Sequence, residues 1–412
     1  MFDTKRIFVL LMLSALLLTA CIPLSMRQRS DAPLSEGQTL AQLHLEGRSE
    51  TLCAAWIPYF TCDALFASDD EEVCRNAVRV YLKKLREFGI NTVFVHVCAF
   101  GESTYPSAYY PNAPGAHGHD ELRIFTEICA EEQIALHAWI NPLRLQTEEY
   151  MNAQQSDALI CGWYRDLNTK RLNLSRWDGR WYLNPASSAA GDFLAGVIGE
   201  IIAQYHPAGI HIDDYFYPTV ETAWDMNDFA ASGATDLAEW RRENITALVR
   251  RMYAAVHTAD AETVFSISPQ GNLSLNRDEL YADIEKWCKE PGCCDLIVPQ
   301  LYFGYENDTC PYADTLAEWA SLPRAASVAM AAGLAAYKVG ETDGFAGSGL
   351  REWQTSGMIL ARQAADAQAV PDFCGLSFYH ADALLHLPEL ERDALRSVLM
   401  AEQENAASGN GG

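Results

Sequence analysis

The chain has 412 residues, of which 49% are hydrophobic, and a formal net charge of −25. The hydrophobic content supplies a large core and excludes a disordered chain. The negative charge repels phosphate backbones and no basic stripe opposes it, so we expect no nucleic-acid partner. The length suits a single α/β barrel with loop insertions.

The two ends of the chain differ in composition from the rest. Lys5 and Arg6 form a basic start, and the apolar run over residues 7–18 is too short to span a bilayer comfortably. Residues 18–21 (LTAC) resemble a bacterial lipobox, in which the cysteine is acylated. We therefore predict a lipoprotein signal peptide over 1–20, lipidation of Cys21, a flexible tether over 21–48 and a flexible tail over 404–412. The protein would be exported and lipid-anchored at the cell membrane surface or outer membrane.

From residue 51 onward, short apolar runs rich in β-branched residues alternate with amphipathic helices. Eight strands are predicted over residues 52–58, 91–100, 134–142, 209–216, 263–269, 295–302, 326–337 and 374–379. The helices are predicted over residues 74–88, 120–132, 189–205, 237–257, 277–289, 313–320, 351–367 and 388–401.

This alternation implies parallel strands joined by right-handed crossovers, and eight such units close into a (β/α)8 TIM barrel, here over residues 49–403. The alternative is an open, doubly wound sheet, which typically has a Gly-rich loop after its first strand, whereas residues 56–59 read WIPY. Long loops follow strands three and four, over 145–185 and 218–236. Their Trp and Tyr residues either stack on sugars or form the cores of the loops.

The end of the fourth strand carries the most informative residues. In barrels the active site lies at the carboxyl ends of the strands. Ile210 and Ile212 alternate with His211 and Asp213, so the isoleucines should face the helices and Asp213 the barrel mouth, with Asp214 on the turn. Two carboxylates at one mouth, ringed by aromatics, suit glycoside hydrolysis, in which one acid protonates the leaving oxygen. Their proximity also separates their pKa values, which keeps one protonated.

Other polar and aromatic residues near the strand ends complete the predicted site. Glu102 is either a further catalytic carboxylate or a solvated loop residue, and His137 and His211 either contact substrate or lie in the core. The predicted substrate-binding residues are His137, Trp139, Asn141, Arg144, His211, Tyr215, Tyr217, Ser268, Gln300, Tyr302 and Tyr379. The sequence contains no GxSxG, HExxH or P-loop motif and no repeated CxxC pair, so we expect no cofactor and no metal.

Residues 209–218 (GIHIDDYFYP), at the end of the fourth predicted strand, and several other segments in chain order resemble glycosyl-hydrolase-like family ten of bacterial surface proteins. The strand-four segment is the most specific. The others are residues 91–94 (NTVF), 105–107 (YPS), 137–142 (HAWINP), 240–244 (WRREN), 268–269 with Gly271, 281–283 (YAD), 299–302 (PQLY) and 337–340 (YKVG). The resemblance implies a glycosidase-type barrel, often a lipoprotein, some members of which act on peptidoglycan glycan strands lacking stem peptides.

The adjacent acids after strand four also resemble those of enzymes that use substrate assistance on N-acetylglucosamine. This resemblance implies that Asp213 orients the acetamido group and that Asp214 is the proton donor. The leading hypothesis is therefore a hydrolase of amino-sugar glycan, with peptidoglycan strands as the expected substrate. The alternatives are a hydrolase of another dietary or host polysaccharide and a non-catalytic, lipid-anchored glycan-binding protein.

Overall fold

The computed structural model of the chain describes residues 51–409, with side chains to residue 401. The predicted signal peptide, the lipidation site Cys21, the tether and the last three residues of the predicted tail lie outside the described residues. No helix within the described part is both long enough and apolar enough to cross a membrane.

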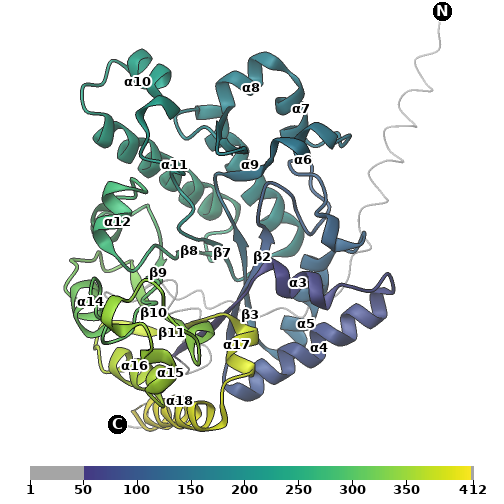
Figure 1. Ribbon diagram of the computed structural model, residues 1–412. Helices are drawn as coiled ribbons and strands as arrows, with labels where there is room; N and C mark the ends of the chain where they lie inside the picture. Colours follow the sequence, from purple (N-terminus) through teal and green to yellow (C-terminus); the bar gives the residue numbers. More distant parts are fainter. Residues whose placement is uncertain (1–50, 410–412) are drawn as a thin grey trace, which may run out of the picture. The chain divides into compact units, whose positions relative to one another are not determined.

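Eight parallel strands close into a barrel, which confirms the predicted (β/α)8 fold (Figure 1). Around the barrel the strands follow the order β1-β11-β10-β9-β8-β7-β3-β2. Their bounds are β1 Leu52–Ile57, β2 Thr92–Cys98, β3 Ala135–Ile140, β7 Gly209–Ile212, β8 Val264–Ile267, β9 Leu296–Ile297, β10 Ala329–Ala335 and β11 Phe373–Tyr379. Each lies within or beside a predicted strand.

Helices surround the barrel and fill the loops. Those that follow strands are α3 Tyr59–Leu65, α4 Glu71–Phe88, α5 Glu121–Glu132, α9 Ser188–Tyr205, α11 Leu237–Ala259, α12 Leu273–Asp278, α13 Ile284–Lys289, α14 Tyr312–Ala320, α15 Glu352–Thr355, α16 Ile359–Gln368, α17 Ala381–Leu385 and α18 Glu389–Gly409. The loop helices are η1 Pro114–Ala116, α6 Glu148–Ala153, α7 Leu159–Arg165, α8 Leu167–Asn173, η2 Thr222–Trp224, α10 Met226–Ser232, η3 Ala336–Lys338 and η4 Gly347–Gly349.

Two predicted helices are each divided into two. Residues 277–289 break between α12 and α13, where Tyr281 has a positive φ of 53° and the Asp283 side chain caps α13 by accepting from the Lys286 amide. Residues 351–367 break between α15 and α16, where Met358 has a φ of 62°. In both places a residue in the left-handed backbone conformation interrupts the predicted helix.

The loop after β3 holds a small antiparallel sheet that the sequence analysis does not predict. Its strands β4 Arg144–Thr147, β5 Leu174–Trp177 and β6 Arg180–Leu183 lie in the order β4-β6-β5. Asp178 and Gly179 form the turn between β5 and β6, with φ values of 45° and 75°. Helices α6, α7 and α8 of the same loop lie together beyond the barrel, at the top of Figure 1. The predicted long loops after the third and fourth strands are thus present.

Alternation along β7 directs its residues as predicted. Ile210 and Ile212 pack in the large core between barrel and helices. His211 points into the barrel, where the Trp56 indole donates to its Nε2 at 3.0 Å and its Nδ1 contacts Ser266 Oγ at 2.8 Å. Burial holds the pKa of His211 well below its ordinary value, so the imidazole stays neutral. The barrel interior below the mouth is therefore a packed, hydrogen-bonded core.

The long loop after β7 is tied to α11 by a buried ion pair. The Arg241 side chain is 0% exposed and binds both oxygens of Asp225, with Nε–Oδ2 at 2.8 Å and Nη2–Oδ1 at 2.6 Å. Its Nη1 also donates to the Tyr281 hydroxyl at 2.8 Å and to the Val220 carbonyl at 3.1 Å. One guanidinium thus fixes this loop against the rest of the barrel wall.

Arg241→Met should destabilise the protein strongly, because it leaves the Asp225 carboxylate buried without a partner. We expect the free energy of unfolding to fall by about 3–5 kcal/mol, measured by urea denaturation. Arg242→Met is the matched control, since Arg242 pairs with the half-exposed Glu239 at 2.7 Å and should lose less than about 1 kcal/mol. Equal losses for the two variants would contradict the anchoring role.

Candidate active site

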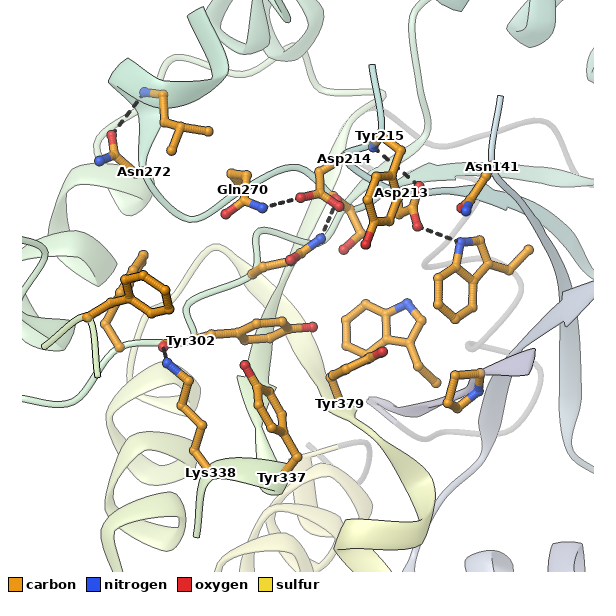
Figure 2. A pocket seen from close by; sticks show the side chains of 18 of the residues that line it. Asn141, Asp213, Asp214, Tyr215, Gln270, Asn272, Tyr302, Tyr337, Lys338 and Tyr379 are labelled. Atoms are coloured by element: carbon orange, nitrogen blue, oxygen red, sulfur yellow. Dashed lines mark hydrogen bonds between the residues drawn. The ribbon is translucent and has the colours of Figure 1, made fainter. Parts of the chain in front are cut away.

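A cavity of about 600 Å³ lies at the carboxyl-terminal mouth of the barrel. Its lining draws on the end of every strand, namely Tyr59, Phe100, Asn141, Asp213, Ser268, Gln300, Tyr337 and Tyr379. Ten of the residues predicted from the sequence line it: Trp139, Asn141, Arg144, Asp213, Asp214, Tyr215, Ser268, Gln300, Tyr302 and Tyr379. Figure 2 shows the acidic pair across the cavity from three tyrosines.

Asp213 follows β7 directly and is held in place by two donors. Its side chain is 3% exposed. The Trp139 indole donates to Oδ2 at 3.1 Å, and the Tyr215 backbone amide donates to Oδ1 at 3.4 Å. Burial raises the pKa of Asp213 well above its ordinary value and the neighbouring Asp214 raises it further, while these two donors oppose the rise. Asp213 is therefore an oriented carboxyl group at the floor of the cavity.

Asp214 lies on the turn, nearer to solvent. The side-chain amide of Gln270 donates to it (Figure 2). The side-chain amide of Gln300 also hydrogen-bonds to Asp214, and it donates to the Ser268 carbonyl at 3.0 Å. Burial raises the pKa of Asp214, whereas the two amides and, more weakly, the Arg144 guanidinium lower it. An acid with a raised pKa that is still in contact with the cavity can donate a proton to a ligand.

The two acids titrate as a coupled pair. Because Asp213 is the more deeply buried, its neutral form is favoured when no ligand is bound. A ligand N–H that donates to Asp213 would stabilise the ionised form of Asp213 and leave the proton on Asp214. The arrangement can thus make Asp214 the acid when a suitable ligand binds.

Three tyrosines form the wall opposite the acids. Tyr302 follows β9, Tyr337 lies in η3 after β10, and Tyr379 ends β11. Tyr302 and Tyr379 stack with ring centroids 5.8 Å apart, and Tyr337 meets Tyr379 edge-on at 5.7 Å. Phenol rings with hydroxyls present both an apolar face and hydrogen-bonding groups, as a sugar ring requires.

Four predicted site residues do not line the cavity. Glu102 is buried and accepts a hydrogen bond from Gln146 Nε2 at 2.6 Å, so it occupies a structural contact in the loop after β2. His137 lies deeper in the barrel, with Nδ1 3.3 Å from Ser266 Oγ, beside His211 in the interior network. Tyr217 packs against Tyr281 and the Arg241 guanidinium, because the chain has already turned away from the mouth.

Several lining residues were not predicted, among them Trp56, Tyr59, His96, Phe100, Gln270, Asn272, Tyr337, Lys338, Asp343 and Phe345. Gln270 could have been found, since it lies two residues beyond Ser268 on the same strand end. No motif or periodicity in the sequence marks Phe345 as a site residue. In the structure it lies at the rim of the cavity and is 95% exposed. Asp343 is the third carboxylate on the cavity wall, and it pairs with Lys338 at 2.7 Å.

The aromatic residues of the loop after β3 take no part in the cavity lining. Trp163 packs on Phe193 with centroids 5.2 Å apart, and Tyr164 meets Trp181 edge-on at 5.5 Å. The Lys170 ammonium lies 3.5 Å from the Tyr164 ring centroid. These rings form the core of the loop itself, which is the second of the two predicted roles.

Trp139→Phe tests the hydrogen bond to Asp213. The substitution removes the indole donor while keeping an aromatic ring against His96, on which Trp139 stacks at 3.6 Å. Because the donor lowers the pKa of Asp213, its loss should move the acidic limb of the pH–rate profile to higher pH and lower kcat about ten-fold. Trp181→Phe, in the loop core, should leave the profile unchanged. An unshifted acidic limb in Trp139→Phe would show that this hydrogen bond does not lower the pKa of Asp213.

Across residues 51–401, no group of three or more His, Cys, Asp or Glu side chains is arranged to hold a metal ion. Cys98 on β2 and Cys129 on α5 are buried in the core.

Solved structures share the barrel at low sequence identity. The catalytic domain of a β-amylase from Paenibacillus polymyxa matches with a TM-score of 0.56 and 10% identity, covering 86% of this chain and 99% of that one. A β-galactosidase from Marinomonas ef1 matches with a TM-score of 0.53 and 11% identity, covering 87% of this chain and 60% of that one. Likenesses at this identity show the fold alone.

Two relatives in sequence are more informative. A protein named glycosyl hydrolase DigH, from Escherichia coli strain K12, is 26% identical over 361 residues, which is 80% of each chain. A protein named glycosyl hydrolase YngK, from Bacillus subtilis strain 168, is 28% identical over 287 residues, or 63% of this chain and 55% of that one. Together with the barrel and its acidic mouth, these similarities define the class of the protein as glycoside hydrolase.

The profile of one family matches most of the barrel. Its description is glycosyl hydrolase-like 10, and it covers residues 56–346. The chain therefore belongs to the glycosyl hydrolase-like 10 family. The matched span begins at Trp56 on the cavity wall and includes Asp213 and Asp214.

Proposed function

We propose that this protein hydrolyses glycan built from N-acetylated amino sugars, with peptide-free peptidoglycan strands as the substrate. Asp214 acts as general acid and base, and Asp213 orients the substrate acetamido group. The observation that carries the proposal is the adjacent pair itself: a buried carboxyl group, Asp213, beside a half-buried one, Asp214, each with its own donors, in a cavity with a tyrosine wall.

The first step breaks the glycosidic bond. The substrate acetamido oxygen attacks the anomeric carbon while the bond from that carbon to the leaving oxygen breaks, and Asp214 gives its proton to that oxygen. Asp213 accepts a hydrogen bond from the acetamido N–H and stabilises the positive charge that develops on this group. In the second step, water attacks the anomeric carbon and gives its proton to Asp214, while the bond from that carbon to the acetamido oxygen breaks and the acetamido group is restored.

Substrate assistance accounts for the distribution of carboxylates. A retaining enzyme with a protein nucleophile places its two carboxyl groups about 5 Å apart on either side of the scissile bond. Among the described residues, the carboxylates on the cavity wall are Asp213, Asp214 and Asp343. Asp343 already forms an ion pair with Lys338. Glu102 is bound to Gln146 outside the lining. A nucleophile supplied by the substrate removes the need for a distant carboxylate.

The cavity also offers contacts for the rest of the sugar. Asn141 lines the cavity, and its amide is held in place because Nδ2 donates to the Ala99 carbonyl at 2.7 Å. Tyr302, Tyr337 and Tyr379 supply a face for stacking, and the exposed Phe345 ring extends the aromatic surface to the rim. Export and a lipid anchor at Cys21, supported by the sequence of residues 1–21, would place this cavity beside wall glycan.

A panel of glycans tests the substrate class. The purified protein is incubated with peptide-free peptidoglycan strands, with N-acetylglucosamine oligomers and with neutral glucan and mannan, and products are identified by mass spectrometry. Cleavage confined to the N-acetylated glycans supports the proposal. Cleavage of glucan or mannan would contradict it and favour another polysaccharide, and binding without any product would contradict catalysis.

A further inference from the structure

Arg144 presents a guanidinium group to the cavity between two aromatic rings. It begins β4, directly after the end of β3, and it lines the cavity. Its guanidinium carbon lies 4.9 Å from the Phe100 ring centroid and 4.7 Å from that of Tyr215. The two rings hold the guanidinium in place, and one of them, Tyr215, also hydrogen-bonds to it through its hydroxyl. The remaining N–H groups of Arg144 can donate to a ligand.

The charge on Arg144 has no carboxylate partner. Two arginines show what a paired guanidinium looks like in this chain: Arg176 of the same small sheet binds Glu148 at 2.7 Å, and Arg241 binds Asp225 at 2.6 Å. Over residues 51–401, by contrast, no carboxylate lies within ion-pair distance of Arg144. In a protein of net charge −25, a negatively charged ligand would supply the carboxylate partner that Arg144 lacks.

A second guanidinium adds to this positive charge. The Arg180 guanidinium carbon lies 5.1 Å from the same Phe100 ring, and its Nη1 donates to the Leu145 carbonyl at 2.7 Å. Burial lowers the pKa of Arg180, and the charge of Arg144 lowers it further. The two cations repel each other beside one ring, and an anion bound at Arg144 would relieve that repulsion.

We propose that Arg144 binds a carboxylate carried by a sugar of the glycan, so that the cavity has a subsite for an acidic sugar. This inference rests on the proposed function, because the carboxylate must belong to the glycan that Asp214 cleaves. A planar guanidinium matches a carboxylate through two parallel hydrogen bonds. The carboxylate can be the lactyl group of a peptide-free muramic sugar or the acid group of a uronic sugar, which offer the same chemistry.

Binding at Arg144 would also act on the catalytic pair. The Arg144 guanidinium is one of the groups that lower the pKa of Asp214. A carboxylate bound to Arg144 offsets this charge and favours the protonated form of Asp214, which is the acid that the reaction requires. An acidic sugar would thus raise kcat as well as lower KM, whereas a merely structural arginine would show no dependence on the substrate carboxyl group.

The test uses peptide-free glycan strands with free carboxyl groups and the same strands after chemical reduction of those groups to alcohols. We expect the wild-type protein to lose about 10–100-fold in kcat/KM on the reduced glycan, the range for a charge-assisted contact. Arg144→Gln should lose a similar factor in kcat/KM on the glycan with free carboxyl groups. On the reduced glycan, its loss in kcat/KM should be smaller by at least about ten-fold. Arg176→Gln, which removes a paired arginine from the same sheet, is the matched control and should cleave both glycans like the wild type.

Equal kcat/KM of the wild-type protein on the free and reduced glycans would overturn this inference and leave the proposed function standing. So would an equal loss in Arg144→Gln on both glycans. Cleavage of neither glycan would instead contradict the proposed function, so binding of both is also measured by titration calorimetry. If the wild type binds the free acid about ten-fold more tightly than the reduced glycan, and Arg144→Gln abolishes this difference, the subsite is supported even without turnover. Equal affinity of the wild type for the two glycans overturns it. Repeating the titration with a uronate-bearing glycan identifies which source of carboxylate fits.

Discussion

Asp214→Asn lowers kcat on an amino-sugar glycan by about 10³-fold, because the leaving oxygen loses its proton donor. The asparagine keeps the size of the side chain, and it can still contact Gln270 and Gln300 after its amide turns. We therefore expect the thermal unfolding midpoint and KM to change little. Steady-state kinetics on N-acetylglucosamine oligomers measure the loss.

The leaving group provides the control for this prediction. An aryl glycoside whose phenolate leaves without a proton should lose less than about ten-fold in kcat/KM in the same variant, because kcat/KM reports the first step and that step then needs no acid. The wild-type profile should be bell-shaped, and activity should fall as pH rises through the raised pKa of Asp214 and the acid loses its proton. On the natural glycan, the residual activity of Asp214→Asn should lack this alkaline limb. Equal losses on both substrates would rule out the acid role.

Asp213→Asn lowers kcat by about 10²–10³-fold, because a neutral amide cannot stabilise the positive charge that develops on the acetamido group. The effect should fall on kcat more than on KM, since the charge develops only in the transition state. In contrast to Asp214→Asn, the loss should be as large on the aryl glycoside as on the natural glycan. Kinetics of both variants on both substrates therefore assign separate roles to the two acids.

The substrate acetamido group offers a matched chemical control. A glycoside with a hydroxyl in place of the acetamido group should be cleaved at least about 10³-fold more slowly by the wild-type protein, because it lacks the internal nucleophile. For this poor substrate, Asp213→Asn should add little further loss, since its partner is already absent. Comparable cleavage of the two glycosides by the wild type would contradict substrate assistance.

The barrel and its acidic mouth could be predicted because both depend on short-range patterns. Alternation of apolar and polar residues along 209–213 determines that Asp213 faces the mouth, and the repeated strand–helix units determine that this mouth is shared by eight strands. Asp178-Gly179 is also a local signal, typical of a hairpin, that predicts the turn between β5 and β6 although the sequence analysis did not use it.

The remaining features depend on contacts between distant parts of the chain. Strand periodicity ends at Asp213, so it could not show that Tyr217 packs on Tyr281, 64 residues later, away from the cavity. Glu102 has the composition of a catalytic carboxylate, and only its contact with Gln146, 44 residues away, shows its structural role. Phe345 stands out because it is exposed at the rim, and Arg144 because its partners are aromatic rings and not a carboxylate; neither property is encoded in local sequence.

The most direct test of hydrolysis by the acidic pair is incubation of the protein with peptide-free peptidoglycan strands, with product masses read by mass spectrometry. Wild type, Asp213→Asn and Asp214→Asn are run side by side after circular dichroism shows that all three are folded. We predict oligosaccharides whose masses include one added water per cleaved bond, and a rate at least about 10²-fold lower in each variant. Products lacking that water, or undiminished cleavage by either variant, would contradict the account.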